Sequence, residues 1–504
     1  MEAEIKQKLD KITDSLRDSF LSEPITCLEQ ISYLIYLKLL DEQESEKIQL
    51  RGAKQELLFP QQAERYRWSK WKDKTGKDLL DFVKDEVFYY MANSLLKDDP
   101  KVAEYFREAI LEITSPDIFQ TIIEQLDSLG SNWDRKIWGE IFEYLLDYYL
   151  SEQSDRKTTG FYYIPQQIRT LMVEMVDPDF GEKICDLAVG VGHFLTDSLN
   201  HILAKYSDRP TEVPSWEQLE ASIYGFDVSS EMTRIARMNL FLHGIPNPKV
   251  KLANVLSESD GLTENDLRRR YQVILTAPPF GRVLPKYSMR DDLPINSKNS
   301  ESLFLAAMMK SLQAGGRGAI VVPKALLFRT SKSDLELRQI LLRDFDLLAV
   351  VSLPPGVFLY TAIETAVLVF RKPVDKDSQR VEQVWFYEVK SDGFGGRKKR
   401  ETKELNDIPE LLQKWNDYKA SGFERPPGIE AKTLLEAGSQ EPNCWWASLE
   451  TIAENNWDLT PEQYRPQVLE KLPDETPAEL IREVLAIESE IVADLKKLLQ
   501  EVEG

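Results

Sequence analysis

Strand-like runs alternate with helix-like segments between residues 156 and 371, and this alternation limits the fold more than any other feature of the sequence. Apolar, β-branched runs predict strands near residues 183–187, 222–227, 248–252, 271–276, 317–323, 347–352 and 364–371. Segments with helical periodicity lie between them, near 165–175, 193–205, 230–242, 300–313 and 333–343. Strands that alternate with helices are typical of a doubly wound sheet. The predicted fold class is therefore α/β.

One of these strands ends in two prolines. The apolar run Tyr271–Thr276 is followed directly by Ala277-Pro278-Pro279-Phe280. Proline has a fixed φ and no N–H, so the two prolines cannot continue a hydrogen-bonded ladder and form a stiff loop at the strand's carboxyl end. Ligands bind at this edge of open α/β sheets. Phe280 is then predicted to offer a flat face to a planar substrate such as a nucleobase.

Polar residues and a glycine turn mark the same edge of the predicted sheet. Asp186 ends the first strand, and a turn containing Gly190 and Gly192 separates it from the next helix. Asp227 ends the second strand, and Asn254 follows the third. Glycines let the backbone approach a ligand, and a carboxylate at a strand end can bind ribose hydroxyls or an ammonium group. A tight structural turn explains the glycines equally well, but the order of the whole set favours a nucleoside cofactor.

Residues 1–155 predict helices, because apolar residues recur at helical spacing in the segments 31–39 and 142–149. A basic and aromatic cluster surrounds Trp68 and Trp71. It could face DNA, but the core of a domain interface is the favoured interpretation.

The end of the chain predicts a helical tail, because the strand pattern stops after Pro442. Thr476 is a candidate N-cap, and Pro477 suits the first position of a helix. Apolar residues then follow at intervals of four and three: Leu480, Val484, Ile487, Ile491, Leu495, Leu498 and Val502. A seam this long favours packing on a partner helix, in another subunit or in the same chain. Upstream, the glycine-rich run 392–396 predicts a surface loop.

The net charge of −21 repels phosphate, so a nucleic-acid contact needs local basic clusters or a partner that supplies positive charge. Two small clusters occur, at 268–270 and 397–400, and each alone is more simply a solvated turn. Three isolated cysteines and three histidines favour neither disulfides nor a metal centre. No apolar stretch is long enough to span a bilayer, and the first residues do not read as a signal peptide, so we expect a cytoplasmic protein without a membrane partner.

From about residue 25 onwards, a series of motifs resembles one family. The stretches are Ile31-Ser32-Tyr33-Leu34-Ile35-Tyr36-Leu37-Lys38, Ala236-Arg237-Met238-Asn239-Leu240-Phe241-Leu242-His243-Gly244, Leu275 to Gly281, Gly315-Gly316-Arg317-Gly318 before Val321-Val322-Pro323, Leu353-Pro354-Pro355-Gly356-Val357-Phe358, and Asn456-Trp457-Asp458-Leu459-Thr460-Pro461. In this order they are similar to the modification (M) subunit of type I restriction–modification systems, an adenine-N6 DNA methyltransferase. The strand, diproline and aromatic residue resemble motif IV of the amino-methyltransferases.

The resemblance implies a division into three parts. These are a helical N-terminal domain (1–155), a Rossmann-like methyltransferase domain that uses S-adenosylmethionine (156–440) and a C-terminal helical segment for subunit assembly (441–504). The implied partners are a specificity (S) subunit, a second M or M-like subunit, double-stranded DNA and, in some assemblies, an ATP-dependent restriction subunit, all acting in defence. Base readout then belongs largely to the S subunit, which makes the acidic charge of this chain less of an obstacle.

The resemblance also assigns roles to residues. The target adenine is flipped out of the duplex and stacks on Phe280. The side chain at position 277 and a backbone carbonyl of Pro278-Pro279 accept hydrogen bonds from its exocyclic amine and align it with the methyl group. The residues implied for cofactor binding are Pro165, Asp186, Gly190, Gly192, Asp227 and Asn254.

Four positions depart from the family's pattern. Ala277 replaces the Asn or Asp acceptor, His193 replaces a glycine of the cofactor turn, Asn254 replaces an acid, and Ile164 replaces the threonine before Pro165. Alanine at 277 alone could be an introduced inactivating change, whereas the four together indicate natural loss. Two hypotheses follow: an active methyltransferase with a variant pocket, or a catalytically inactive M-like subunit that serves as a DNA-binding or assembly scaffold.

Overall fold

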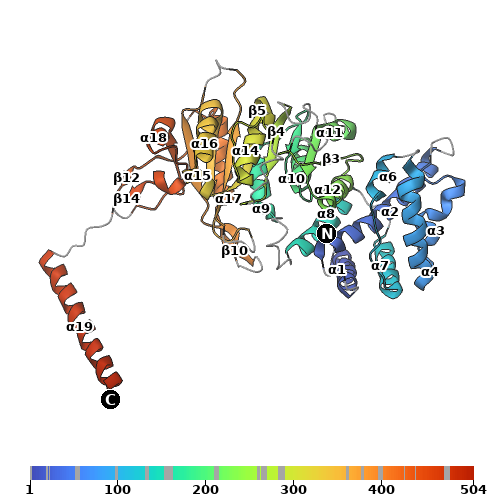
Figure 1. The fold of residues 1–504 in the computed structure, drawn as a ribbon, viewed down its shortest axis with the longest axis horizontal. Coiled ribbons are helices and arrows are strands. Elements are labelled where there is room, and N and C mark those ends of the chain that lie inside the picture. Colours follow the sequence, from blue (N-terminus) through green and yellow to red (C-terminus); the bar gives the residue numbers. More distant parts are fainter. Residues whose placement is uncertain are drawn as a thin grey trace.

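The computed structural model shows a helical region beside an α/β region, with the last helix standing apart from both (Figure 1). The structure describes residues 3–18, 21, 23–51, 57–96, 100–130, 135–151, 163–208, 215–257, 262, 270–281, 290–358, 363–375, 380–395, 401–424, 426–436, 439–469 and 477–503.

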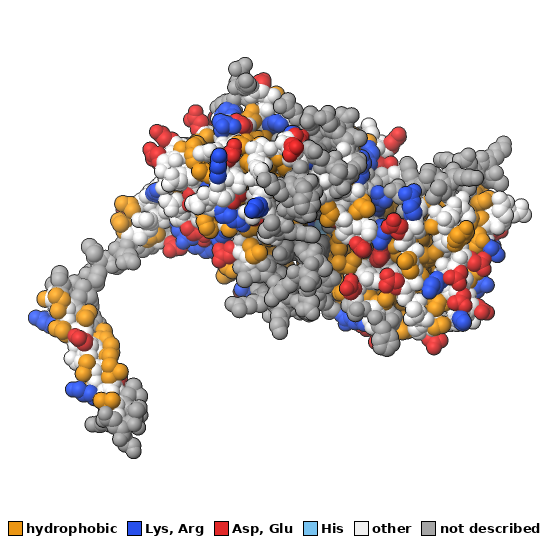
Figure 2. All heavy atoms as spheres, in the orientation of Figure 1, with side chains coloured by type: hydrophobic (Ala, Val, Ile, Leu, Met, Phe, Trp, Pro, Cys, Tyr) orange, Lys and Arg blue, Asp and Glu red, His pale blue; other side chains and the backbone are white. Residues whose placement is uncertain are grey.

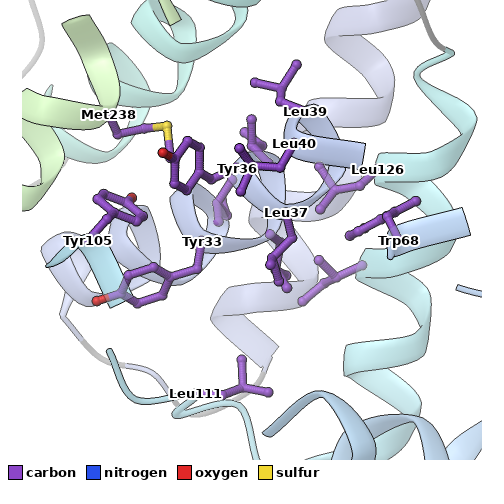
Figure 3. Packing of buried hydrophobic residues seen from close by; sticks show 14 of the residues in the cluster. Tyr33, Tyr36, Leu37, Leu39, Leu40, Trp68, Tyr105, Leu111, Leu126 and Met238 are labelled. Atoms are coloured by element: carbon purple, nitrogen blue, oxygen red, sulfur yellow. The ribbon is translucent and has the colours of Figure 1, made fainter. Parts of the chain in front are cut away.

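The N-terminal region is helical, as the periodicity predicts. Its four longer helices are α1 (Ala3–Asp18), α2 (Pro24–Arg51), α7 (Pro116–Ser128) and α8 (Arg135–Ser151). Between them lie η1 (Gln61–Tyr66), α3 (Trp68–Trp71), α4 (Gly76–Asp81), η2 (Phe82–Val87), α5 (Phe88–Asn93), η3 (Ser94–Leu96) and α6 (Pro100–Phe106). They share one apolar core, which also takes in side chains from α12 (Ser230–Leu242) of the α/β region. Figure 3 shows Met238 of α12 reaching Tyr36 of α2 in this core.

The tryptophan cluster belongs to this core and does not form a DNA-facing surface. Trp68 and Trp71 are 3% and 0% exposed, and their rings meet edge to face at 4.7 Å. The neighbouring cations have acidic partners: Arg67 pairs with Asp41, and the basic residues at 65, 70 and 72 pair with other carboxylates. The interpretation as core is therefore the better one.

The α/β region is built on a ten-stranded sheet with the order β11-β13-β8-β6-β7-β5-β4-β1-β2-β3. Its strands are β1 (Ile184–Asp186), β2 (Ile223–Asp227), β3 (Lys249–Leu252), β4 (Tyr271–Thr276), β5 (Leu312–Pro323), β6 (Asp346–Ser352), β7 (Thr365–Arg371), β8 (Gln383–Glu388), β11 (Ile429–Glu430) and β13 (Cys444–Ser448). The strands from β3 to β5 pair in parallel, whereas β7 runs antiparallel to both of its neighbours. The strand order reverses between β1 and β4, which is where open α/β sheets bind ligands.

Helices cover both faces of the sheet. On one face, α9 (Gln166–Val176), α10 (His193–Lys205), α12 and α17 (Ile408–Ala420) share a core with inward residues of β4 and β5. On the other, α14 (Ser300–Ser311), α16 (Lys332–Asp344) and α18 (Leu449–Glu454) pack on the alternate residues. The remaining elements are α11 (Trp216–Ser222), α15 (Ala325–Phe328), η6 (Pro461–Tyr464), β12 (Leu434–Leu435) and β14 (Gln467–Val468). All seven predicted strands and five predicted helices of this region are present.

Two boundary predictions were wrong. The strand pattern does not stop after Pro442, because β13 pairs antiparallel with β8 and carries Trp445 into the core. The run predicted as a surface loop instead contains β9 (Asp392–Gly395), which pairs with β10 (Glu401–Asn406). Gly396 and the basic cluster at 397–400 lie outside the described residues, as do 268 and 269 of the other basic cluster.

The C-terminal helix α19 (Pro477–Glu503) exposes a broad apolar face, which Figure 2 shows as a row of hydrophobic side chains. Eight residues are between 44% and 64% exposed: Ile481, Val484, Leu485, Ile487, Ile491, Val492, Leu495 and Leu499. The predicted seam is present at 484, 487, 491 and 495, whereas Thr476 and the side chains of 480, 498 and 502 are not described. Among the described helices, none combines the length and the apolar character needed to cross a membrane.

Candidate functional site

A cleft of about 470 Å³ lies at the carboxyl ends of β1, β2 and β4. Asp186 ends β1, Asp227 ends β2 and Ala277 follows β4. All three line the cleft, together with Pro279. Because parallel strands bring their carboxyl ends to one edge, residues that are far apart in the sequence meet here. The structure thus brings together the strand-end residues that the sequence singled out.

The glycine turn after β1 is tied to the end of β2. The N–H of Gly190 donates to Oδ2 of Asp227 at 3.0 Å, and the N–H of Ser229 donates to Oδ1 at 2.9 Å. Gly192 has a φ of 90°, and a Cβ at this residue would lie 3.4 Å from Ala236 of α12. The turn therefore requires glycine for its backbone conformation and for its close packing.

Two carboxyl groups in the cleft have raised pKa values. Asp186 is 1% exposed, and its Oδ1 accepts the N–H of Ala188 at 3.0 Å. Burial raises the pKa of Asp186 to about 7, although that N–H lowers it in part. Burial also raises the pKa of Asp227, against the backbone N–H groups that it accepts. A cation in the cleft would favour the ionised form of both groups.

The described lining of the cleft is acidic. Glu23 and Glu231 join the two aspartates, and no lysine or arginine is among the lining residues that the structure describes. The electrostatic potential in such a cleft is negative, which suits a ligand with a net positive charge. The described residues contain no group of three or more acidic, histidine or cysteine side chains arranged to hold a metal ion.

The diproline loop is fixed by the start of α14. The hydroxyl of Ser300 donates to the carbonyl of Pro279 at 2.5 Å, and Oε2 of Glu301 accepts the N–H of Gly281 at 2.9 Å. Glu301 is fully buried and pairs with Arg329 at 2.7 Å. A buried carboxylate, paired with a half-buried arginine, thus holds the loop that follows β4.

Phe280 differs from the expectation of an exposed flat face. The side chain is 7% exposed, belongs to the core beneath α9 and α10, and meets Phe358 edge to face at 6.1 Å. It is not among the residues that line the cleft. The apolar ring gains more from this core contact than from water, so stacking on a base would require the ring to leave its place.

The other departures from the family's pattern lie around the cleft. The ring of His193 contacts α8, where Nε2 lies 3.2 Å from Oε2 of Glu143 without the alignment of a hydrogen bond. Asn254 lines the cleft, and its Oδ1 accepts the N–H of Leu256 at 3.0 Å. Ile164 lines the cleft, whereas Pro165 precedes α9 as its N-cap and is not among the lining residues. The role of Pro165 in cofactor binding therefore stays a prediction.

Sequence reasoning missed the part of the cleft that the helical region supplies. Glu23, Ile25 and Thr26, at the start of α2, also line the cleft. They are separated from Asp186 by most of the helical region and share no motif with it. No spacing signal in a single sequence could have assigned them to this site.

Family models and individual proteins match nearly the whole chain. The N-6 DNA Methylase model matches residues 133–471, and the HsdM N-terminal domain model matches residues 5–126. The type I restriction enzyme EcoEI methylase subunit of Escherichia coli is 28% identical over 495 residues, covering 95% of this chain and 93% of that protein. The EcoKI methylase subunit of Escherichia coli K12 is 26% identical over 411 residues, covering 77% and 72%.

Two solved structures share the fold of this chain. A chain from a study of complex assembly and conformational transition in the type I R-M system has a TM-score of 0.69 at 25% identity, covering 99% of this chain and 98% of that one. The methyltransferase subunit of a type I restriction-modification system from Streptococcus thermophilus has the same fold, with a TM-score of 0.62, 18% identity and coverage of 92% and 99%. The chain therefore belongs to the N-6 DNA methylase family, as an M subunit of the type I restriction–modification kind.

Proposed function

We propose that the chain binds S-adenosylmethionine in this cleft and methylates adenine N6 in double-stranded DNA, as part of a complex with an S subunit. The observation that carries the proposal is the acidic cleft at the switch point, bounded by Asp186 and Asp227 on one side and by Ala277 and Pro279 on the other. S-adenosylmethionine is a cationic nucleoside that supplies an activated methyl group, and the acidic lining suits its charge. A second M-type chain and a restriction subunit are proposed as further members of the complex.

Different residues of the chain would bind the cofactor and the target base. Asp227, at the end of β2, is placed to accept ribose hydroxyls, and Asp186 is placed to balance positive charge. The carbonyl of Pro279 already accepts the hydroxyl of Ser300, and no described residue donates to the carbonyl of Pro278. Pro278 is buried and, unlike Pro279, is not among the residues that line the cleft. Its carbonyl is the acceptor that we propose for the exocyclic amine, since the side chain of Ala277 has none.

A second candidate function follows from Ala277. With one of two acceptors missing, the amine is held less firmly and transfer slows by about 10²–10³-fold. If cofactor binding is lost as well, the chain acts as a DNA-binding or assembly subunit without catalysis.

Two measurements separate the candidates. Calorimetry with S-adenosylmethionine tests the cleft directly, and transfer of a labelled methyl group to duplex DNA tests the complex with an S subunit. Binding accompanied by slow transfer supports the enzyme. An intact complex with neither heat nor transfer supports the scaffold and refutes the first proposal.

Cofactor affinity is expected to rise with pH. Because the pKa of Asp186 is raised to about 7, its carboxyl is mostly neutral at pH 6 and mostly ionised at pH 8. A cationic ligand that pairs with the ionised form should bind about tenfold more tightly at the higher pH. Calorimetry at both pH values checks this. Asp186→Asn should remove the part of the pH dependence that belongs to this group, and an unchanged profile in that variant would contradict the assignment.

Assembly is expected to depend on the apolar face of α19. A chain truncated before Pro477 should lose the S subunit in size-exclusion chromatography while it keeps cofactor binding, because the cleft lies in another part of the fold. Leu485→Asp should weaken assembly, since it places a charge on that face. Glu490→Gln, on the opposite side of the same helix, is the matched control and should leave assembly intact. Equal behaviour of both variants would show that the face is not the contact.

A further inference from the structure

Glu143 of α8 lies at the centre of a group of polar contacts between the helical region and the α/β region. Its Oε2 is 3.2 Å from Nε2 of His193 and 3.6 Å from Nη2 of Arg169. Its Oε1 accepts a hydrogen bond from Nδ2 of Asn239 at 3.2 Å. The three partners come from α10, α9 and α12, so one carboxylate of the helical region touches three helices of the α/β region.

Each partner of Glu143 either lines the proposed cofactor cleft or contacts a residue that lines it. Nδ2 of Asn239 also donates to the carbonyl of Val191 at 3.1 Å, immediately before Gly192. His193 follows Gly192 directly. The residues on both sides of Gly192 are therefore held by contacts, Val191 by Asn239 and His193 by Glu143. The Nη1 of Arg169 donates to the carbonyl of Ile164 at 3.1 Å, and Ile164 also lines the cleft.

The charges around Glu143 favour its ionised form. Burial alone would raise the pKa of Glu143, but its interactions with His193, Arg169 and His243 outweigh burial, so the pKa lies well below its ordinary value. Glu143 is half-buried, and such partners offset the cost of taking a carboxylate partly out of water. The helical region and the α/β region also pack closely here, because a Cβ at Gly139 of α8 would lie 2.9 Å from the ring of His243.

We propose that Glu143 is a positioning residue through which the helical region sets the shape of the cofactor turn, by holding Asn239 and His193 on either side of Gly192. The part of this inference that concerns the cofactor rests on the proposed function. Binding is reciprocal, so a ligand that requires the ordered turn also strengthens the docking of α8. His193 then has a structural reason to differ from glycine: its ring contacts the other region of the chain.

Glu143→Gln tests the proposal, because it keeps the size of the side chain and removes its charge. We expect S-adenosylmethionine affinity to fall about tenfold, and hydrogen exchange at residues 187–196 to become faster in the protein without cofactor. Asp41→Asn is the matched control. It removes the charge of a different carboxylate of the helical region, which is buried, pairs with Arg67 and does not contact the cleft, so it should change neither measurement.

Variants of His193 separate positioning from general packing. His193→Ala should reproduce the loss seen in Glu143→Gln, and the double variant should be little worse than either single one, because both break the same contact. His193→Gln keeps a polar N–H group within reach of Glu143 and should restore most of the affinity.

Two results would overturn the inference: equal effects of the Glu143 and Asp41 variants, or unchanged exchange in the turn of Glu143→Gln. If the wild-type chain binds no S-adenosylmethionine, the proposed function fails, but hydrogen exchange still decides whether Glu143 orders the turn.

Discussion

Asparagine at position 277 is expected to raise the rate of methyl transfer by about 10²–10³-fold in the complex with an S subunit. Ala277 lines the cleft beside Pro279 and follows β4 directly, so an amide there would face the space where the target amine must lie. The amide oxygen would add a second acceptor to the carbonyl of Pro278. Single-turnover transfer of a labelled methyl group to duplex DNA measures the change.

The matched control for this prediction is Ala277→Val, which adds bulk without an acceptor. It should leave the rate at or below that of the natural chain. Equal gains in both variants would mean that filling the cleft, and not hydrogen bonding, limits transfer. No gain with asparagine, while the cofactor still binds, would place the limiting defect elsewhere, and the buried ring of Phe280 would be the first place to look.

Arg329→Met is expected to destabilise the fold by about 3–5 kcal/mol. It leaves the fully buried Glu301 carboxylate without its cation, and Asp334, which is also fully buried, loses a more distant one at 3.8 Å. Urea unfolding followed by fluorescence measures the loss. Because Glu301 also accepts the N–H of Gly281, hydrogen exchange at the diproline loop should become faster at the same time.

The double variant Glu301→Gln with Arg329→Met checks the cause. A neutral amide still accepts from Gly281 and needs no cation, so the pair should recover most of the stability that the single variant loses. If the double variant is as unstable as Arg329→Met alone, lost packing of the arginine stem would explain the effect, and the uncompensated charge would not.

The central fold could be predicted from the sequence because its signals are local. The run from Tyr271 to Thr276 is apolar, and the prolines that follow end it. Neighbouring residues therefore predict both the presence of β4 and the position where it ends. The outer strands lack such signals. β13 contains Trp445 and Trp446 and is separated from β8 by α17, and only its antiparallel pairing with β8 makes it part of the sheet.

The site could be predicted as far as it lies on strand ends. Asp186, Asp227 and Ala277 meet because parallel strands share an edge, a rule that needs only the order of elements. The contributions of Glu23 and Glu143 depend on how a separate helical region docks, and no single-sequence pattern encodes that. The burial of Phe280 depends likewise on a partner, Phe358, from a distant loop.

The apolar face of α19 has a consequence for how this protein must be made. Eight apolar side chains exposed to water can bind other hydrophobic surfaces. Chains produced in excess of their partner subunit should therefore aggregate or be degraded. Balanced synthesis of the two polypeptides, from one transcript or one expression vector, would keep that surface covered from the start.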